Sequence, residues 1–177
     1  MKTELNDLKN ILRNYNAFEI ISYIFKNYNK KACFASSFSI EDQVILDMIS
    51  KINTDSYIFT LDTGRLPEET YDIITKSMEK YKLKIKIFFP DKNEVEKMIS
   101  ENNPNLFYDS IEKRQLCCRI RKIEPLKRAL NGMEIRVTGL RKEQSVTRQN
   151  LEIAEWDENN NLIKINPLLN WKTFDVS

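Results

Sequence analysis

The amino-acid sequence predicts an α/β fold in which helices cover both faces of a mostly parallel sheet. Three strand-like runs are each followed by a stretch in which apolar residues have helical spacing, and this order is typical of a parallel sheet. The chain has 177 residues, of which 41% are hydrophobic and only three are Gly. It is therefore long and apolar enough for one domain with its own core.

The first 30 residues predict two helices. Apolar residues recur at helical spacing over residues 5–13 and again over residues 18–26. A short apolar run over residues 31–34 then predicts the first strand. We therefore expect residues 1–30 to form N-terminal helices that pack on a core domain, and residues 31–177 to form that domain.

The middle of the chain continues with two more strand–helix units. β-Branched and aromatic residues predict strands over 56–61 and 85–89, and helical spacing predicts helices over 41–50 and 93–101. Pro67 is expected to be the first residue of the helix that follows the second strand, because its fixed φ suits that position.

The last third of the chain predicts a short helix and then a return to strands. The helix covers residues 124–130, with Pro125 expected to open it and Asn131-Gly132 to end it. The remaining pattern predicts a strand, a polar loop and a hairpin, over residues 135–138, 139–148 and 151–165. Ligands of such sheets bind outside the carboxyl ends of the strands, so the loops that follow the strands are expected to face one site.

The composition excludes several classes of function. The chain contains no His, which rules out a Ser-His or Cys-His nucleophile pair and any zinc site with a His ligand. No apolar run approaches the roughly 20 residues that span a bilayer. The first residues also lack the apolar segment of a secretory signal, so we expect a cytoplasmic protein without a membrane partner.

Positive charge is concentrated in one part of the sequence. Eleven Lys and Arg but only three Glu lie between Lys113 and Arg148, although the net charge of the chain is +2. This local excess favours a confined anion site over a general nucleic-acid surface. A solvated cationic face is the alternative.

Hydroxyl residues follow the first predicted strand. Ser36, Ser37 and Ser39 lie between that strand and a helix, where hydroxyls and backbone N–H groups can bind an anion. A Ser N-cap for the helix is the alternative. The loop lacks the Gly-Lys-Ser/Thr of a Walker A motif.

A second loop at the same edge of the sheet contains Thr63, Gly64 and Arg65. Gly64 permits a tight turn, and Arg65 is long enough to reach a phosphate or carboxylate. A purely structural turn is the alternative.

Two adjacent thiols lie in the basic part of the chain. Cys117 and Cys118 are flanked by cations, which favour the thiolate form and so suit metal ligation or nucleophilic attack. A pair of inert thiols is the alternative. The third cysteine, Cys33, lies on the first predicted strand and is expected to be a buried structural thiol.

The polar loop after the fourth predicted strand contains Arg141, Lys142 and Arg148, interleaved with hydroxyls and an amide. Such a set is suited to bind a sulfate or phosphate group. A generic solvated loop is the alternative.

Taken together, these segments resemble successive motifs of assimilatory adenylyl-sulfate (APS) reductases, within the PAPS/APS reductase family. The resemblance covers residues 31–176 and is carried by SSFSIEDQV, LDTGRLPEETY, CCRIRKIEPLKRAL, TGLRKEQSVTR and NPLLNWKTFDV. It implies an adenine nucleotide α-hydrolase-like fold, related to the PP-loop ATP pyrophosphatases. Residues 31–177 are accordingly expected to be the nucleotide-binding domain, incomplete at its C-terminus.

The resemblance also implies a reaction. In the family, a cysteine thiolate near the C-terminus attacks the sulfur of APS, displaces AMP and becomes an S-sulfocysteine. Thioredoxin then releases sulfite. The expected ligands are therefore APS or AMP, and the expected protein partner is thioredoxin; no nucleic-acid partner is expected, and homo-oligomer formation is left open.

The resemblance assigns roles to individual positions. Ser36, Ser37 and Ser39 match the phosphate loop, Leu61 and Gly139 match contacts to the adenosine, and Lys142 and Arg148 match phosphosulfate-binding cations. Cys117 and Cys118 match the first two ligands of a 4Fe–4S cluster, and Lys122 matches a lysine that links cluster and substrate. The paired cysteines also favour APS over PAPS, its 3′-phosphorylated relative.

The sequence departs from the family at its end. The family's other two cluster ligands and its nucleophilic Cys would lie beyond Ser177, so the chain is expected to be truncated and to form no sulfite by itself. A non-catalytic adenine-nucleotide-binding module and a PAPS reductase are the alternatives. A PP-loop enzyme that adenylates its substrate is disfavoured, because the Gly-Gly-x-Asp-Ser pattern of those ATP users is missing.

Overall fold

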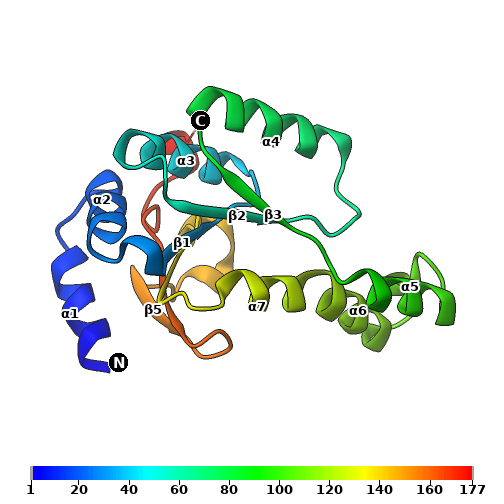
Figure 1. The fold of residues 1–177 in the computed structure, drawn as a ribbon. Helices are drawn as coiled ribbons and strands as arrows, with labels where there is room; N and C mark the ends of the chain where they lie inside the picture. Colours follow the sequence, from blue (N-terminus) through cyan, green and yellow to red (C-terminus); the bar gives the residue numbers. More distant parts are fainter. Residues whose placement is uncertain (1, 177) are drawn as a thin grey trace.

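The computed structural model describes residues 2–176, apart from the side chains of Lys2, Thr3 and Thr147. It contains a six-stranded sheet with the strand order β3-β2-β1-β4-β6-β5. Neighbouring strands are parallel except for β5, which pairs antiparallel with β6. Helices lie on both faces of the sheet (Figure 1). The predicted fold class is therefore confirmed.

Strands and helices alternate along the chain up to α5. The strands are β1 (Ala32–Ala35), β2 (Tyr57–Leu61), β3 (Ile85–Phe88), β4 (Ile135–Val137), β5 (Ala154–Asp157) and β6 (Leu162–Ile165). The helices are α1 (Lys2–Leu12), α2 (Ala17–Asn27), α3 (Ile40–Ile52), α4 (Glu68–Tyr81), α5 (Lys92–Glu101), α6 (Ile111–Cys118), α7 (Glu124–Leu130) and α8 (Thr173–Val176).

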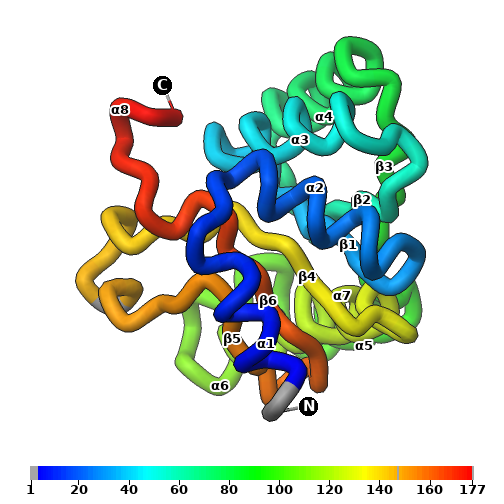
Figure 2. The backbone as a smooth tube through the Cα atoms, turned by 90° about the vertical axis from the view of Figure 1, so that its left-hand side faces the viewer, coloured from blue at the N-terminus to red at the C-terminus, as the bar shows by residue number. Residues whose placement is uncertain are grey.

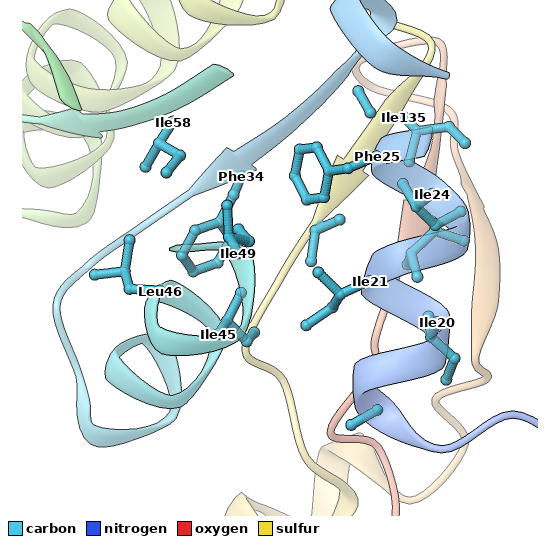
Figure 3. Close-up of a cluster of buried hydrophobic side chains, with 14 of the residues drawn as sticks. Ile20, Ile21, Ile24, Phe25, Phe34, Ile45, Leu46, Ile49, Ile58 and Ile135 are labelled. Atoms are coloured by element: carbon cyan, nitrogen blue, oxygen red, sulfur yellow. The ribbon is translucent and has the colours of Figure 1, made fainter. Parts of the chain in front are cut away.

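The main core lies between the sheet and the helices α2 and α3. Ile21 and Ile24 of α2, Ile45 and Ile49 of α3 and Phe34 of β1 are all fully buried in it (Figure 3). Burial of side chains of this size stabilises the fold by roughly 1.5–3 kcal/mol each. Both N-terminal helices contribute to this core, whereas a domain boundary at residue 30 stays a prediction.

The opposite face of the sheet is covered by α7. Side chains alternate between faces along a strand, so Cys33 and Phe59 point away from the main core and pack with Ala129 and Leu130 of α7. The segment from α5 to α7 extends beyond the edge of the sheet (Figure 1). Figure 2, turned by 90°, shows α1 and α2 on the same side of the sheet, in front of its strands.

One helix start differs from the sequence prediction, and one predicted helix continues a preceding one. Pro67 is the N-cap of α4, with extended backbone angles, and the helix begins at Glu68. The predicted bounds of α7, residues 124–130, are confirmed, with Pro125 in its first turn. The helix does not start afresh there, because α6, a π-helical turn over Arg119–Ile123 and α7 run on without a break. The N–H of Glu124 donates to the carbonyl of Arg119, five residues back, and this wider turn carries the helix past a proline that has no N–H to donate.

Within residues 2–176, we found no helix with both the length and the apolar character to cross a membrane.

Candidate functional site

A cavity of about 400 Å³ lies at the carboxyl ends of β1 and β2, where an open α/β sheet is expected to bind its ligand. The loops after both strands form part of its wall, and the helical segment before α7 forms another part. The predicted site residues that line it are Ser36, Ser37, Leu61, Thr63, Arg65 and Lys122.

The loop after β1 is held by a carboxylate. The backbone N–H of Ser37 donates to Asp42 Oδ2 at 2.5 Å, and the Ser37 hydroxyl donates to the same oxygen at 2.8 Å. The N–H of Phe38, a residue with a φ of +61°, donates to Ser36 Oγ at 3.1 Å. Ser39 occupies the N-cap position of α3, but its side chain makes no capping hydrogen bond. The two serines nearest the cavity are thus held in fixed positions.

Asp42 also explains why a glycine follows β4. Burial of the Asp42 carboxyl raises its pKa, although the hydrogen bonds from Ser37 act in the opposite direction. A Cβ atom at Gly139 would lie 2.4 Å from Asp42 Oδ1, closer than any real contact. Gly139 therefore packs against the carboxylate that holds the first loop, and it is not itself among the described residues that line the cavity.

The loop after β2 forms a tight turn. Gly64 has a φ of +69°, and its N–H donates to Asp62 Oδ1 at 2.7 Å. The Arg65 guanidinium donates to the carbonyl of Pro104 at 2.8 Å and to Asn105 Oδ1 at 2.9 Å, and it stacks on a phenylalanine ring. These contacts anchor Arg65 at the cavity wall.

A second, smaller cavity of about 290 Å³ adjoins the first. Both paired cysteines line it, together with Arg114 and Arg121. Lys122, Thr63 and Arg65 line both cavities. Lys122 therefore lies at the boundary between the strand-tip cavity and the paired thiols, which is where a lysine that links the two would have to be.

The three cysteines have different surroundings. Cys117 is buried and Cys118 is exposed, both at the end of α6. Cys33 is fully buried, and its thiol donates to the carbonyl of Ile135 at 3.4 Å. Burial raises the pKa of Cys33 to about 12, which suits the structural role expected of it.

The paired thiols match only part of a cluster ligand set. Within the described residues, no group of three or more Cys, Asp or Glu that could hold a metal ion is found. A 4Fe–4S cluster takes four thiolates, so Cys117 and Cys118 fit half of such a ligand set.

The loop after β4 is tied to α3 through Arg141. Arg141 is buried, and its Nη2 and Nε donate to Glu41 Oε1 at 2.7 and 3.0 Å. Its Nη1 donates to Glu143 Oε2 at 3.2 Å and to the carbonyl of Trp171 at 3.3 Å. These contacts tie the loop to α3 and engage all three guanidinium nitrogens of Arg141. The predicted contact of Arg141 with an anion stays a prediction.

The two other cations of this loop also lie away from the cavity lining. The Arg148 guanidinium donates to Gln144, and the backbone N–H of Lys142 donates to the carbonyl of Leu169 at 3.0 Å. Neither side chain is among the described residues that line the cavity. Their predicted contact with an anion therefore stays a prediction.

Sequence reasoning missed one cation of the cavity wall. Arg136, in the middle of β4, lines the cavity beside the serine loop. A signal was present, because a charged residue between two apolar ones in a strand has to point to the opposite face of the sheet.

Comparison with known proteins gives the context for this geometry. Residues 31–177 match the family model described as phosphoadenosine phosphosulfate reductase domain. Adenosine 5′-phosphosulfate reductase of Allochromatium vinosum is 44% identical over 160 residues, which are 90% of this chain and 62% of that protein. Adenosine 5′-phosphosulfate reductase 2 of Bacillus subtilis is 37% identical over 89% of this chain and 66% of its own length. The chain thus spans less than two thirds of these relatives.

Solved structures show the same architecture. The phosphoadenylyl-sulfate reductase of Candida auris, solved as a phosphate complex, superposes with a TM-score of 0.83 at 27% identity, over 99% of this chain and 83% of that one. An NAD synthetase of Campylobacter jejuni, at 10% identity and a TM-score of 0.58, shares the fold alone.

These findings place the molecule in the adenine nucleotide α-hydrolase-like class of α/β proteins. Within that class, the chain belongs to the phosphoadenosine phosphosulfate reductase domain family.

Proposed function

We propose that this chain is the nucleotide-binding part of a reductase that converts adenylyl sulfate to sulfite and AMP in sulfate assimilation. The family assignment and the relatives named as adenosine 5′-phosphosulfate reductases support this function. The observation that carries it is the position of Lys122, which lines both the strand-tip cavity and the cavity of the paired thiols.

In this proposal the cavity binds the anionic nucleotide. The Ser36 hydroxyl and the Lys122 ammonium supply donors for phosphosulfate oxygens, and the backbone at Leu61 contacts the adenosine. The Ser37 hydroxyl donates its proton to Asp42 and so keeps the loop in position. Arg65, already anchored, adds positive charge at the wall. Together these groups hold the sulfur of the ligand toward the boundary with the second cavity.

The chemical step requires a thiolate that attacks that sulfur. The new S–S bond forms as the bond between sulfur and the bridging oxygen breaks, and that oxygen leaves on AMP with the electron pair. A dithiol such as that of thioredoxin then attacks the S-sulfocysteine, is oxidised to a disulfide and releases sulfite. Because these steps need reduced thiols, a reducing compartment such as the cytoplasm suits the protein.

The described cysteines are poorly suited to be this nucleophile. Cys33 is fully buried with a pKa of about 12, so it is almost entirely in the thiol form at neutral pH. Cys117 and Cys118 match cluster ligands of the family. They make up half of a four-thiolate ligand set. We therefore expect this chain to bind the nucleotide without forming sulfite.

PAPS reduction is the second candidate. Structural similarity to the phosphoadenylyl-sulfate reductase of Candida auris, with a TM-score of 0.83, favours it. The paired cysteines favour APS, since they match the cluster-containing members of the family. Assay of both nucleotides decides between the two.

A fusion experiment tests the proposed function. The C-terminal segment of an APS reductase, with its Cys-x-x-Cys and its Glu-Cys-Gly tail, is joined to Ser177, and sulfite release is measured with thioredoxin and either APS or PAPS. We expect sulfite from APS with the fusion and none with the 177-residue chain.

The control is the same fusion with the tail nucleophile changed to Ser, which should bind AMP and release no sulfite. A folded fusion that binds AMP but never forms sulfite from either nucleotide would show a non-catalytic binding module. Sulfite from the 177-residue chain would show that one of Cys33, Cys117 and Cys118 is the nucleophile.

A further inference from the structure

Arg136 is a charged residue in the middle of the sheet. It lies on β4 beside Cys33 of β1, between Ile135 and Val137, whose side chains belong to the main core. Its own side chain points to the other face and lines the strand-tip cavity, together with Ser37 and Lys122. A cation from a central strand therefore forms part of the cavity wall.

Among residues 2–176, the Arg136 guanidinium forms no ion pair, although the charges of Asp157 and Asp42 act on it from a greater distance. Its Nε–H donor is fully buried and has no hydrogen-bond acceptor. Its register neighbour on β6 provides a contrast. Lys164 lies directly opposite and forms an ion pair with Glu155 at 2.6 Å. Two cations therefore lie side by side on this face, and only Lys164 is paired.

Burial of an unpaired guanidinium is unfavourable. Desolvation lowers the pKa of Arg136 by more than the charges of Cys33, Asp157 and Asp42 raise it, and the guanidinium stays protonated at neutral pH. A buried charge of this kind is ordinarily paired with an opposite charge, and the open direction here leads into the cavity. The missing partner is therefore expected to be an anionic ligand.

We propose that Arg136 is a specificity-determining residue of the nucleotide cavity, whose guanidinium pairs with the phosphate-borne negative charge of the ligand. This inference rests on the proposed function, because it takes an adenine nucleotide to be the occupant. It adds a residue from the sheet to the donors that the loops provide. The predicted consequence is discrimination between a nucleotide and its uncharged nucleoside.

The test compares AMP with adenosine. Binding of both to the 177-residue chain is measured by calorimetry for the wild type, Arg136→Gln and Arg136→Lys. We expect Arg136→Gln to weaken AMP binding about 10- to 100-fold, as for loss of a charge-assisted hydrogen bond, and to change adenosine binding less than about twofold. Arg136→Lys keeps the charge but loses the planar fork, so its loss for AMP should be smaller.

Thermal unfolding without ligand gives a second readout. Since Arg136 lacks a partner in the free chain, Arg136→Gln should leave the Tm of the ligand-free chain unchanged or raise it. If Arg136 had a structural role, Arg136→Gln would instead lower the Tm and weaken the binding of AMP and adenosine together. That result would overturn the proposal.

Lys164→Met is the matched control, because it removes the paired cation beside Arg136. Its AMP affinity should equal that of the wild type, and an equal loss of affinity in both variants would show a general field effect and contradict the proposal.

If Arg136→Gln does not fold, unchanged AMP binding by Arg136→Lys overturns the proposal. A wild-type chain that prefers AMP while Arg136→Gln retains that preference refutes this inference alone. A wild-type chain that does not distinguish AMP from adenosine refutes the proposed function as well.

Discussion

At the scale of single residues, the site is supported by acidic side chains rather than by the basic ones that the sequence emphasises. Asp42 holds the serine loop through two hydrogen bonds, and Glu41, the residue before it, holds the loop after β4 through Arg141. Two adjacent carboxylates at the start of α3 therefore fix two separate loops. Both are buried, so each depends on its partner for compensation.

The Glu41–Arg141 pair predicts a pH-dependent contribution to stability. Burial pushes the pKa of Glu41 up, but hydrogen bonds from Arg141, from its own backbone and from Gln144 and Ser39 outweigh this and lower it. A lowered folded-state pKa gives stability that is fully present above the unfolded-state value of about 4.3 and is lost as the pH falls through the folded-state value.

Glu41→Gln should therefore reduce the free energy of unfolding at pH 7 by about 3 kcal/mol, as expected when one partner of a buried ion pair is removed. In urea titrations, the difference from the wild type should be constant above about pH 5 and should shrink below about pH 4.3. Glu143→Gln, at the exposed partner of the same arginine, should cause a smaller loss. A difference that did not vary with pH would show that the Glu41 charge is not what stabilises the loop.

Single-residue roles were the hardest part to predict from the sequence. Arg136 and Arg141 are both arginines of one basic segment, yet one has no partner and lines the cavity while the other is fully engaged with Glu41. The difference depends on which residues the fold brings beside each guanidinium. Glu41 lies 100 positions away from Arg141 in sequence, so no local pattern reveals the pair.

At the scale of secondary-structure elements, the continuous helix from α6 to α7 determines how the thiols and the cavity are related. Its π-helical turn contains Arg121 and Lys122, and Arg121 Nη1 donates to the carbonyl of Thr63 at 2.6 Å. The turn therefore docks on the loop after β2 and presents Lys122 to the cavity. Sequence patterns predicted α7 and missed the helix before it, because only apolar periodicity was used and Ile111–Cys118 carries few apolar residues on one face.

The C-terminus of α4 provides a test that belongs to this scale. Its C-cap, Lys82, has left-handed backbone angles of φ +54° and ψ +31°, a conformation that favours glycine. Lys82→Gly should raise the free energy of unfolding by about 0.5 kcal/mol, since relief of the strain exceeds the added entropy of the unfolded chain. Chemical denaturation measures this change.

Lys76→Gly is the control for that measurement, because it makes the same exchange inside the helix. It should lower the free energy of unfolding by about 1 kcal/mol. If Lys82→Gly destabilised the chain as much as Lys76→Gly, the cap residue would have to relax out of the left-handed region in solution.

At the scale of the whole molecule, the sequence predicted the architecture well. The alternation of strands and helices up to residue 101 and the hairpin near residue 160 are confirmed, because strong apolar periodicity reflects burial on the faces of a sheet. The start at Pro67 was wrong by one residue, and the predicted bounds of α7 are confirmed. The π-turn that joins α7 to α6 was missed, since it depends on local hydrogen bonding that the pattern does not contain.

The roles of the cations in the basic segment, residues 113–148, become clear only in the folded molecule. Its charges divide into buried arginines with protein partners, such as Arg121 and Arg141, and cations that line the cavity, such as Lys122 and Arg136. Some cations of the segment therefore hold loops in place, and others line the cavity. This division supports a confined anion site at the strand tips.

The most direct test of the account is the binding of AMP to the 177-residue chain with and without the Lys122 ammonium. Calorimetry at low ionic strength is carried out on the wild type, on Lys122→Met and on Lys127→Met, an exposed lysine of α7 that pairs with Glu124. The account predicts that the wild type binds AMP, that Lys122→Met binds it about 10-fold or more weakly, and that Lys127→Met equals the wild type. AMP binding that is absent in the wild type, or equal in all three proteins, would contradict a nucleotide site at the tips of β1 and β2.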